Sequence, residues 1–137
     1  MTEQAQSPAG TTTPLATATR PQPYRDFFEL FNAGRFFEAH EALESLWLPM
    51  RGGADARFYQ GLIQVAGAFV HFRGDRRGPG VALLRSGRQH LAGYPATHLG
   101  LDVARVRQQV TEWLGRAENG RQNPLKAGPP RIEPPAG

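Results

Sequence analysis

Cysteine is absent from the 137-residue sequence. Its absence excludes disulfides, thiolate metal ligands and a cysteine nucleophile, and it is compatible with a reducing compartment. The sequence also lacks the apolar segment of a secretory signal, and no stretch comes near the roughly 18 consecutive apolar residues that a membrane-spanning helix needs. We therefore expect a cytoplasmic protein that does not enter a membrane.

Strand patterns are missing as well. Residues 24–116 instead divide, at Gly and Pro breaks, into segments whose apolar residues have helical spacing. The breaks fall at residues 32–34, 49–53, 74–80 and 93–95. The sequence thus predicts an all-α fold, a single compact bundle of about five helices, in which the first two form an antiparallel hairpin.

The two ends of the chain have little that could form a core. Residues 1–23 are rich in Ser, Thr, Pro, Ala and Gln, and residues 117–137 are rich in Pro and Gly. Segments of such composition cannot bury enough apolar surface to offset the entropy of ordering. We expect both to be disordered tails that do not pack, on either side of one helical domain at 24–116.

Two aspartates are predicted to start helices. Asp55 is a candidate N-cap for a helix over residues 56–73, which is apolar around most of its circumference and is therefore expected at the centre of the bundle. Asp102 is a candidate N-cap for the last helix. Leu101 before it and Val106 after it have the spacing of a hydrophobic staple.

The second helix has ionisable residues on its apolar face. At 100° per residue, His40 and Glu44 lie within the arc of apolar side chains, and Glu41 lies at its edge. The central helix carries one polar strip of its own. If the two faces meet, they form a semi-buried polar cluster of His40, Glu44, Arg57, Gln60, Gln64 and His71.

A closed structural network is the interpretation of this cluster that we favour. Unpaired buried polar groups cost about 1 to 3 kcal/mol each, so such a network has to be nearly complete. Arg57 would pair with Glu44 or Glu41. Replacing His40 by Ala would then leave Glu44 without a partner and destabilise the fold.

A metal or catalytic site is the first alternative. His40, Glu44 and His71 would form a His₂Glu set like that of catalytic zinc, with Glu41 as the base that takes a proton from bound water. A metal-free acid–base pair of His40 and Glu44 also stays open, although no nucleophile lies beside it. The sequence requires no cofactor, and a divalent ion such as zinc is the candidate if one is bound.

A polyanion-binding module is the second alternative. Residues 24–49 contain five acidic residues and two arginines, whereas residues 73–131 contain eleven basic and four acidic residues. The candidate contacts for nucleic acid or another polyanion are Arg73, Arg76, Arg77, Arg85 and Arg88. No nucleic-acid-binding motif accompanies them, so this interpretation is not favoured.

Three stretches resemble a known family. They are the run F-N-A-G-R-F-F-E-A-H-E-A-L-E-S-L-W at 31–47, the run F-Y-Q-G-L-I-Q at 58–64, and A-F-V-H at 68–71 with the Arg/Gly-rich turn that follows. Over residues 27–114 the chain resembles a bacterial and archaeal family classified as a domain of unknown function, number 309. The resemblance implies a small helical bundle and no particular activity. We expect a non-catalytic structural or interaction domain, with its partners, including a second copy of itself, left open.

Overall fold

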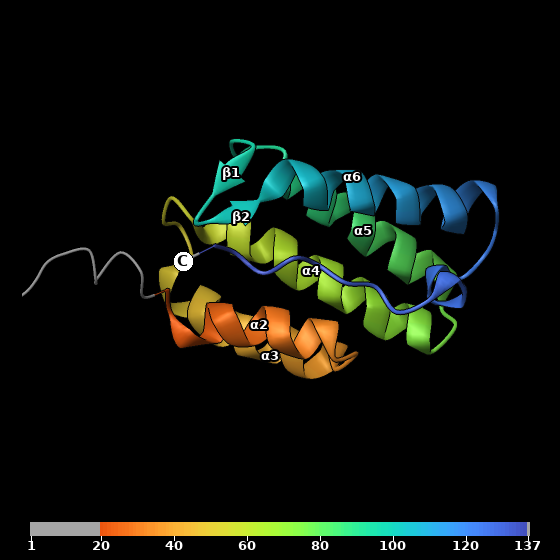
Figure 1. Cartoon of the computed structure of the whole chain (residues 1–137), viewed down its shortest axis with the longest axis horizontal. Coiled ribbons are helices and arrows are strands. Elements are labelled where there is room, and N and C mark those ends of the chain that lie inside the picture. Colours follow the sequence, from red (N-terminus) through yellow and green to blue (C-terminus); the bar gives the residue numbers. More distant parts are fainter. Residues whose placement is uncertain (1–19, 137) are drawn as a thin grey trace, which may run out of the picture.

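The computed structural model describes residues 20–136. Within that range the chain forms five α-helices, one two-stranded hairpin and three short helical turns, so the predicted all-α bundle is confirmed (Figure 1). The helices are α2 (Gln22–Asn32), α3 (Phe36–Trp47), α4 (Ala56–Arg73), α5 (Arg77–Leu91) and α6 (Val103–Leu114). The remaining elements are η1 (Leu48–Met50), β1 (Thr97–His98), β2 (Leu101–Asp102), η2 (Gly115–Asn119) and η3 (Pro124–Ala127).

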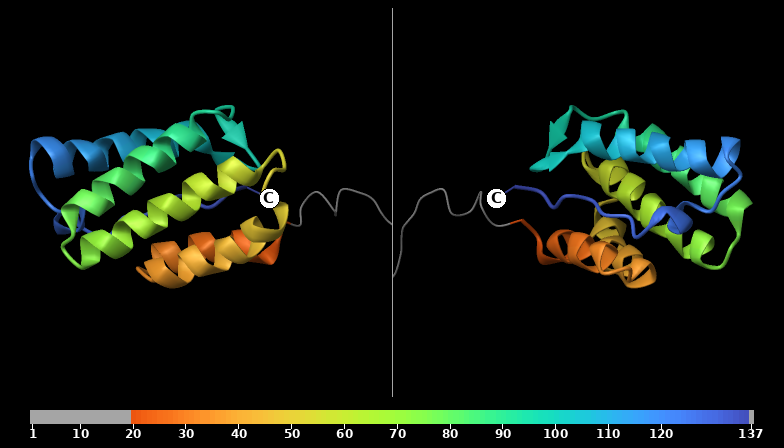
Figure 2. Two further views of the ribbon diagram at one scale, coloured as in Figure 1. Left: turned by 180° about the vertical axis from the view of Figure 1, so that it is seen from behind. Right: turned by 45° about the vertical axis from the view of Figure 1, so that its right-hand side comes forward.

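Helix α4 lies at the centre of the bundle, as its apolar circumference predicts. Seen from behind, α3, α4 and α5 lie side by side as one layer (Figure 2). On the opposite side of α4, α2 and α6 flank the C-terminal segment (Figure 1). The side chains of Phe58, Leu62, Val65 and Phe69 on α4 are completely buried. None of the helices in the described part of the chain is both long and apolar enough to cross a membrane.

The two predicted helix caps have different outcomes. Asp102 caps α6 as predicted, because its carboxylate accepts a hydrogen bond from the backbone N–H of Arg105 at 2.9 Å. Asp55 occupies the predicted N-cap position of α4, but its side chain makes no capping bond. Asp55 has helix-like dihedrals, φ −95° and ψ 0°, rather than the extended conformation of an N-cap. Its carboxylate instead lies 2.8 Å from Nε2 of His98 in β1.

The hairpin of β1 and β2 is not foreseen by the sequence patterns. Each strand has only two residues, which is too short for alternation to be visible. The strands are antiparallel and are joined by Leu99 and Gly100, both with positive φ. That backbone conformation is the one preferred in two-residue hairpin turns. The hairpin places His98 against Asp55 and so attaches the α5–α6 connection to the start of α4.

The C-terminal prediction is wrong for residues 117–136. This segment packs along the bundle and buries Ala117, Pro124, Pro130 and Ile132. Composition alone misses this because an extended, proline-containing chain needs only a few buried side chains and backbone hydrogen bonds to be held in place. At the other end, α2 begins at Gln22, two residues before the expected boundary, and Pro23 occupies its first turn, where proline is tolerated. Residues 1–19 of the predicted N-terminal tail lie outside the described range.

Candidate functional site

Three residues of the predicted polar cluster border the same pocket. His40 of α3 and Gln64 and His71 of α4 line a hollow of about 240 Å³. The rest of its lining is apolar or glycine: Phe37, Ile63, Gly67, Val70 and Leu83. We call this the apolar pocket. It exists because α3 and α5 both pack on α4, leaving a furrow above the strip of α4 that carries Gln64, Gly67 and His71.

The expected closed network does not form. Nδ1 of His40 is buried without a hydrogen-bond partner. Nδ1 of His71 accepts a hydrogen bond from Nε of Arg76 at 3.1 Å, which is a contact outside the predicted cluster. Glu44 is only partly buried, so that solvent can hydrate its carboxylate, and it does not line the apolar pocket. The structure therefore does not join Glu44 to the histidines.

The predicted ion pair of Arg57 with Glu41 or Glu44 is also absent from the ion pairs of residues 20–136. The metal interpretation receives no support. Across the same residues, no three His, Asp or Glu side chains are arranged so that they could hold a metal ion. His40, Glu44 and His71 are thus not brought together as a ligand set, because Glu44 does not line the pocket that His40 and His71 share.

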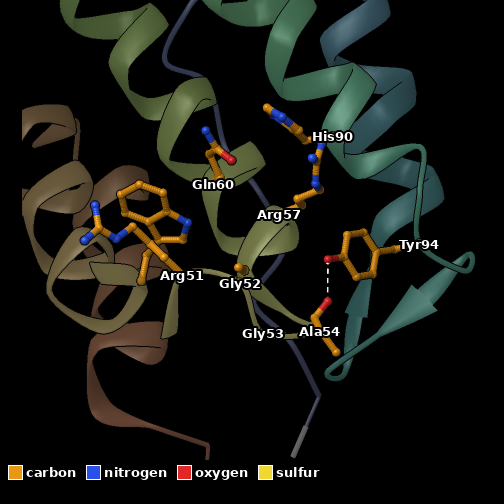
Figure 3. Close-up of a pocket in the computed structure, with 10 residues that line it drawn as sticks. Arg51, Gly52, Gly53, Ala54, Arg57, Gln60, His90 and Tyr94 are labelled. Carbon is orange, nitrogen blue, oxygen red and sulfur yellow. Dashed lines mark hydrogen bonds between the residues drawn. The ribbon is translucent and has the colours of Figure 1, made fainter. Parts of the chain in front are cut away.

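A second, larger pocket lies at the N-terminal end of α4. It measures about 570 Å³ and is lined by Trp47, Arg51, Gly52, Gly53, Ala54, Ala56, Arg57, Gln60, His90 and Tyr94. We call it the arginine pocket. Figure 3 shows Arg51 and Arg57 on opposite sides of it, with Gly52 and Gly53 between them. The hydroxyl of Tyr94 donates a hydrogen bond to the carbonyl oxygen of Ala54 at 2.7 Å, which fixes one wall.

The arginine pocket is positively charged. The guanidinium of Arg51 lies 5.9 Å from the ring centre of Trp47, within the range of a cation–π contact. The side chain of Arg57 points toward His90 (Figure 3). Among residues 20–136, no acidic residue lines either pocket. Arg57 and Gln60, two members of the predicted cluster, therefore belong to this pocket and not to the one that contains His40.

His90 connects the two pockets and is missed by the sequence analysis. Its Nδ1 lies 2.7 Å from Oε1 of Gln64, which lines the apolar pocket, while its ring lines the arginine pocket. Burial, and then the nearby charge of Arg57, lower the pKa of His90. The lowered pKa favours the neutral imidazole, whose Nδ1 shares this hydrogen bond with the amide oxygen. The spacing from Gly87 is a sequence signal that could have indicated His90. Gly87 contacts α4, and His90, three residues later, lies on the same side of α5.

The five arginines of the predicted polyanion surface are all in contact with other parts of the chain. Arg73 donates to the carbonyl oxygen of Gly34, Arg76 to His71, Arg77 to the carbonyl oxygen of Ala117 and Arg88 to the hydroxyl of Thr111, and Arg85 pairs with Glu118. These contacts link helix ends and turns. Arg51 and Arg57 differ from these five, because they line the arginine pocket and have no ion-pair partner within residues 20–136.

Comparison with known proteins agrees with the resemblance seen in the sequence. The model of the family described as "Domain of unknown function (DUF309)" matches residues 24–90. That match covers most of α2, all of α3 and α4, and nearly all of α5, and so includes the helices that line the two pockets. An "Uncharacterized protein" of Aquifex aeolicus (strain VF5) is 29% identical over 96 residues, which is 70% of this chain. The aligned part is 29% of that relative's own length.

Proposed function

We propose that this chain is a non-catalytic interaction domain, which binds an acidic segment of a partner protein. The description of the family whose model it matches names no activity. The binding surface is the groove made of the arginine pocket and the apolar pocket, which we call the α3–α5 groove. Acidic side chains of the partner would enter the arginine pocket, and one large apolar side chain would enter the apolar pocket. We place this binding in the cytoplasm, in keeping with a sequence that lacks cysteine.

The observation that carries the proposal is the unbalanced charge of the arginine pocket. Arg51 and Arg57 border a concave surface to which the described part of the chain contributes no acidic residue. Guanidinium groups form short, charge-assisted hydrogen bonds with carboxylates and can do so with two parallel bonds. The rings of Trp47 and Tyr94 add rigid contact area of the kind found where few residues supply most of the binding energy.

The apolar pocket supports a protein partner over a free anion. Phe37 at its edge is 55% exposed, one of two large hydrophobic side chains in the described chain that are so open to solvent. The ring of His40 lies in the lining of the same pocket. An amphipathic segment would cover the phenylalanine and pack beside the imidazole.

The length of the Aquifex relative also suits a binding role. The region that matches this chain makes up 29% of that protein, so there it is one part of a longer chain. A small helical domain joined to other parts can hold a segment of a partner in place without acting on it chemically.

The test is a selection with random 12-residue peptides displayed on phage, using the full chain as target. Peptides that combine Asp or Glu with Leu, Phe or Trp should be enriched. Their affinity should fall at least tenfold for the variant Arg51→Gln/Arg57→Gln, because each lost charged hydrogen bond is worth about 1.5 to 3 kcal/mol. The matched control is Arg105→Gln/Arg116→Gln, which removes the same charge from exposed positions on α6 and η2.

The control variant should bind the selected peptides like the unmodified chain. Chemical-shift changes on peptide addition should centre on the side-chain amides of Gln60 and Gln64. Selection of basic peptides, equal binding by both double variants, or no enrichment at all would each overturn the proposal. Tighter binding of single-stranded DNA than of any peptide would also overturn it and favour a polyanion ligand.

A further inference from the structure

The C-terminal segment is held on the opposite side of α4, away from the α3–α5 groove. It runs between α2 and α6 in an extended conformation (Figure 1). Pro130 and Ile132 point inward and are buried, whereas Arg131 and Glu133 point outward with side chains 62% and 80% exposed. This alternation is that of an extended peptide lying in a groove.

Asn32 forms two hydrogen bonds with the backbone of this segment. Its Nδ2 donates to the carbonyl oxygen of Ile132 at 2.9 Å, and its Oδ1 accepts from the N–H of the same residue at 2.8 Å. The amide side chain thus takes the place of a neighbouring strand. Gln109 of α6 adds a bond to the carbonyl oxygen of Arg131 at 2.7 Å, and Gly100 accepts from the N–H of Ala136 at 3.0 Å.

Backbone hydrogen bonds combined with a buried side chain are the features of a peptide-recognition site. The hydrogen bonds hold any extended chain, and the side-chain pocket selects the sequence. Here the pocket takes Ile132, which is completely buried. Gly100, at φ +77°, leaves room for the end of the segment, because a Cβ there would lie 2.6 Å from the carbonyl oxygen of Ala136. We call this surface the α2–α6 groove, defined by Asn32, Gly100 and Gln109.

The segment is joined to the bundle by a short, irregular connection. After η3 the chain turns at Gly128, with φ +120°, and from residue 128 to 136 it has no helix or strand of its own. Its position therefore depends on the α2–α6 groove and not on internal structure. Exchange of such a terminal element between identical chains needs no new contacts, since each groove meets the same sequence.

We propose that the α2–α6 groove is a binding site for extended segments of the pattern Pro-X-Ile, and that it accepts residues 128–136 of a second copy of this chain in place of its own. The groove then joins two copies by exchange of their C-terminal segments. This site is separate from the α3–α5 groove, so either proposal can fail without affecting the other.

The experiment pairs two variants of the full chain that complement each other. Asn32→Ala weakens the groove but keeps the segment, and Ile132→Asp disables the segment but keeps the groove. Neither variant alone has both an intact groove and an intact segment, so each should be monomeric in native mass spectrometry. A 1:1 mixture should contain a heterodimer, in which the segment of the Asn32→Ala chain lies in the groove of the Ile132→Asp chain.

A labelled peptide of residues 128–136 gives a second measurement. It should bind the Ile132→Asp chain, and at least tenfold more weakly the unmodified chain, whose own segment competes at high effective concentration. The double variant Asn32→Ala/Ile132→Asp should also lose at least tenfold in affinity. A peptide with Asp in place of Ile should not bind, whereas one with Ala in place of Glu133 should bind normally, because that side chain points to solvent.

Folding of the variants is checked by far-UV circular dichroism. If the Ile132→Asp chain loses helicity, saturating peptide should restore it, which would itself support the proposal. Absence of the heterodimer together with absence of peptide binding, or of peptide-induced refolding, would overturn it. A peptide that binds equally well with Ile or Asp at the central position would overturn it as well.

Discussion

At the scale of single residues, His40 has one ring nitrogen buried without a partner, beside an apolar pocket. Because His40 does not pair with Glu44 as the sequence predicts, there is no longer a reason to expect that replacing His40 strongly destabilises the fold. We predict that His40→Leu leaves the free energy of unfolding unchanged or raises it by up to about 1 kcal/mol, because an unsatisfied buried polar atom is removed. Urea denaturation measures this change.

The same substitution, His40→Leu, should lower the affinity for the peptides selected on the α3–α5 groove, so that stability and binding would change in opposite directions. The control is Glu41→Leu, on the exposed side of α3. It should leave both the free energy of unfolding and the peptide affinity unchanged within experimental error. A loss of more than about 1 kcal/mol in His40→Leu would show that the imidazole makes a stabilising bond in solution.

The lowered pKa of His90 leads to a prediction of how the stability of the fold depends on pH. Its pKa is lowered in the folded chain by burial and by Arg57, so below the ordinary value of 6.5 the unfolded chain binds a proton more readily than the folded one. The stabilisation from this residue is therefore present above pH 6.5 and is lost as the pH falls through and below that value. The NMR titration of the His90 ring should give a midpoint below 6.5.

The variant Arg57→Gln removes the second cause of that shift. Its His90 pKa should move upward, toward the ordinary value, while burial keeps it from reaching that value completely. A midpoint unchanged by Arg57→Gln would indicate that burial alone acts on the ring.

At the scale of helices, α4 and α5 cross closely at two glycines. A Cβ on Gly87 would lie 2.9 Å from the backbone oxygen of Gly61, which is too close for the helices to stay where they are. Gly78, in the first turn of α5, has nothing within 4 Å of the same position. We predict that Gly87→Ala destabilises the fold by about 1 to 3 kcal/mol despite its better helix propensity.

The matched variant Gly78→Ala should stabilise the fold by up to about 1 kcal/mol, since it gains propensity without a clash. Thermal melts followed by circular dichroism compare the two. Equal effects of the same sign would mean that the α4–α5 crossing is looser than the structure places it.

How much of each element could be predicted depends on where its information lies. The bounds of α4, Ala56–Arg73, follow from apolar spacing and the Gly breaks, because a buried helix has a strong periodic pattern. The polar cluster could be predicted only as two facing strips. Which of its residues meet was decided by α5, whose His90 takes Gln64 as partner. Asn32 looked like a helix-ending residue, and its role in holding Ile132, 100 positions away, has no local signal.

At the scale of the whole molecule, the two sides of α4 differ. One side is covered by the chain's own C-terminal segment, and the other borders the arginine pocket and the apolar pocket, where we propose that a partner binds. The arginines that a count of charges assigns to a polyanion surface are engaged in contacts that hold helix ends together. Arg51 and Arg57, which line the arginine pocket and have no ion-pair partner among residues 20–136, are close to the start of α4. Net charge thus says less about function than the pairing of each guanidinium.

The C-terminal segment should unfold together with the helices. Ile132 belongs to the same buried cluster as the side chains of α2, α4 and α6. Replacing it by Ala should lower the free energy of unfolding by about 2 to 4 kcal/mol, through lost apolar burial and the cavity left behind. Because small domains unfold cooperatively, the whole helical signal should shift to lower denaturant in one transition.

Glu133→Ala is the matched control, one residue further along and mostly exposed. It should change stability by less than about 0.5 kcal/mol. If Ile132→Ala also left the transition in place, the segment would contribute no core packing in solution, and the groove between α2 and α6 would be open to solvent. A single shifted transition would instead make residues 117–136 part of the folding unit, although the matched family region ends at residue 90.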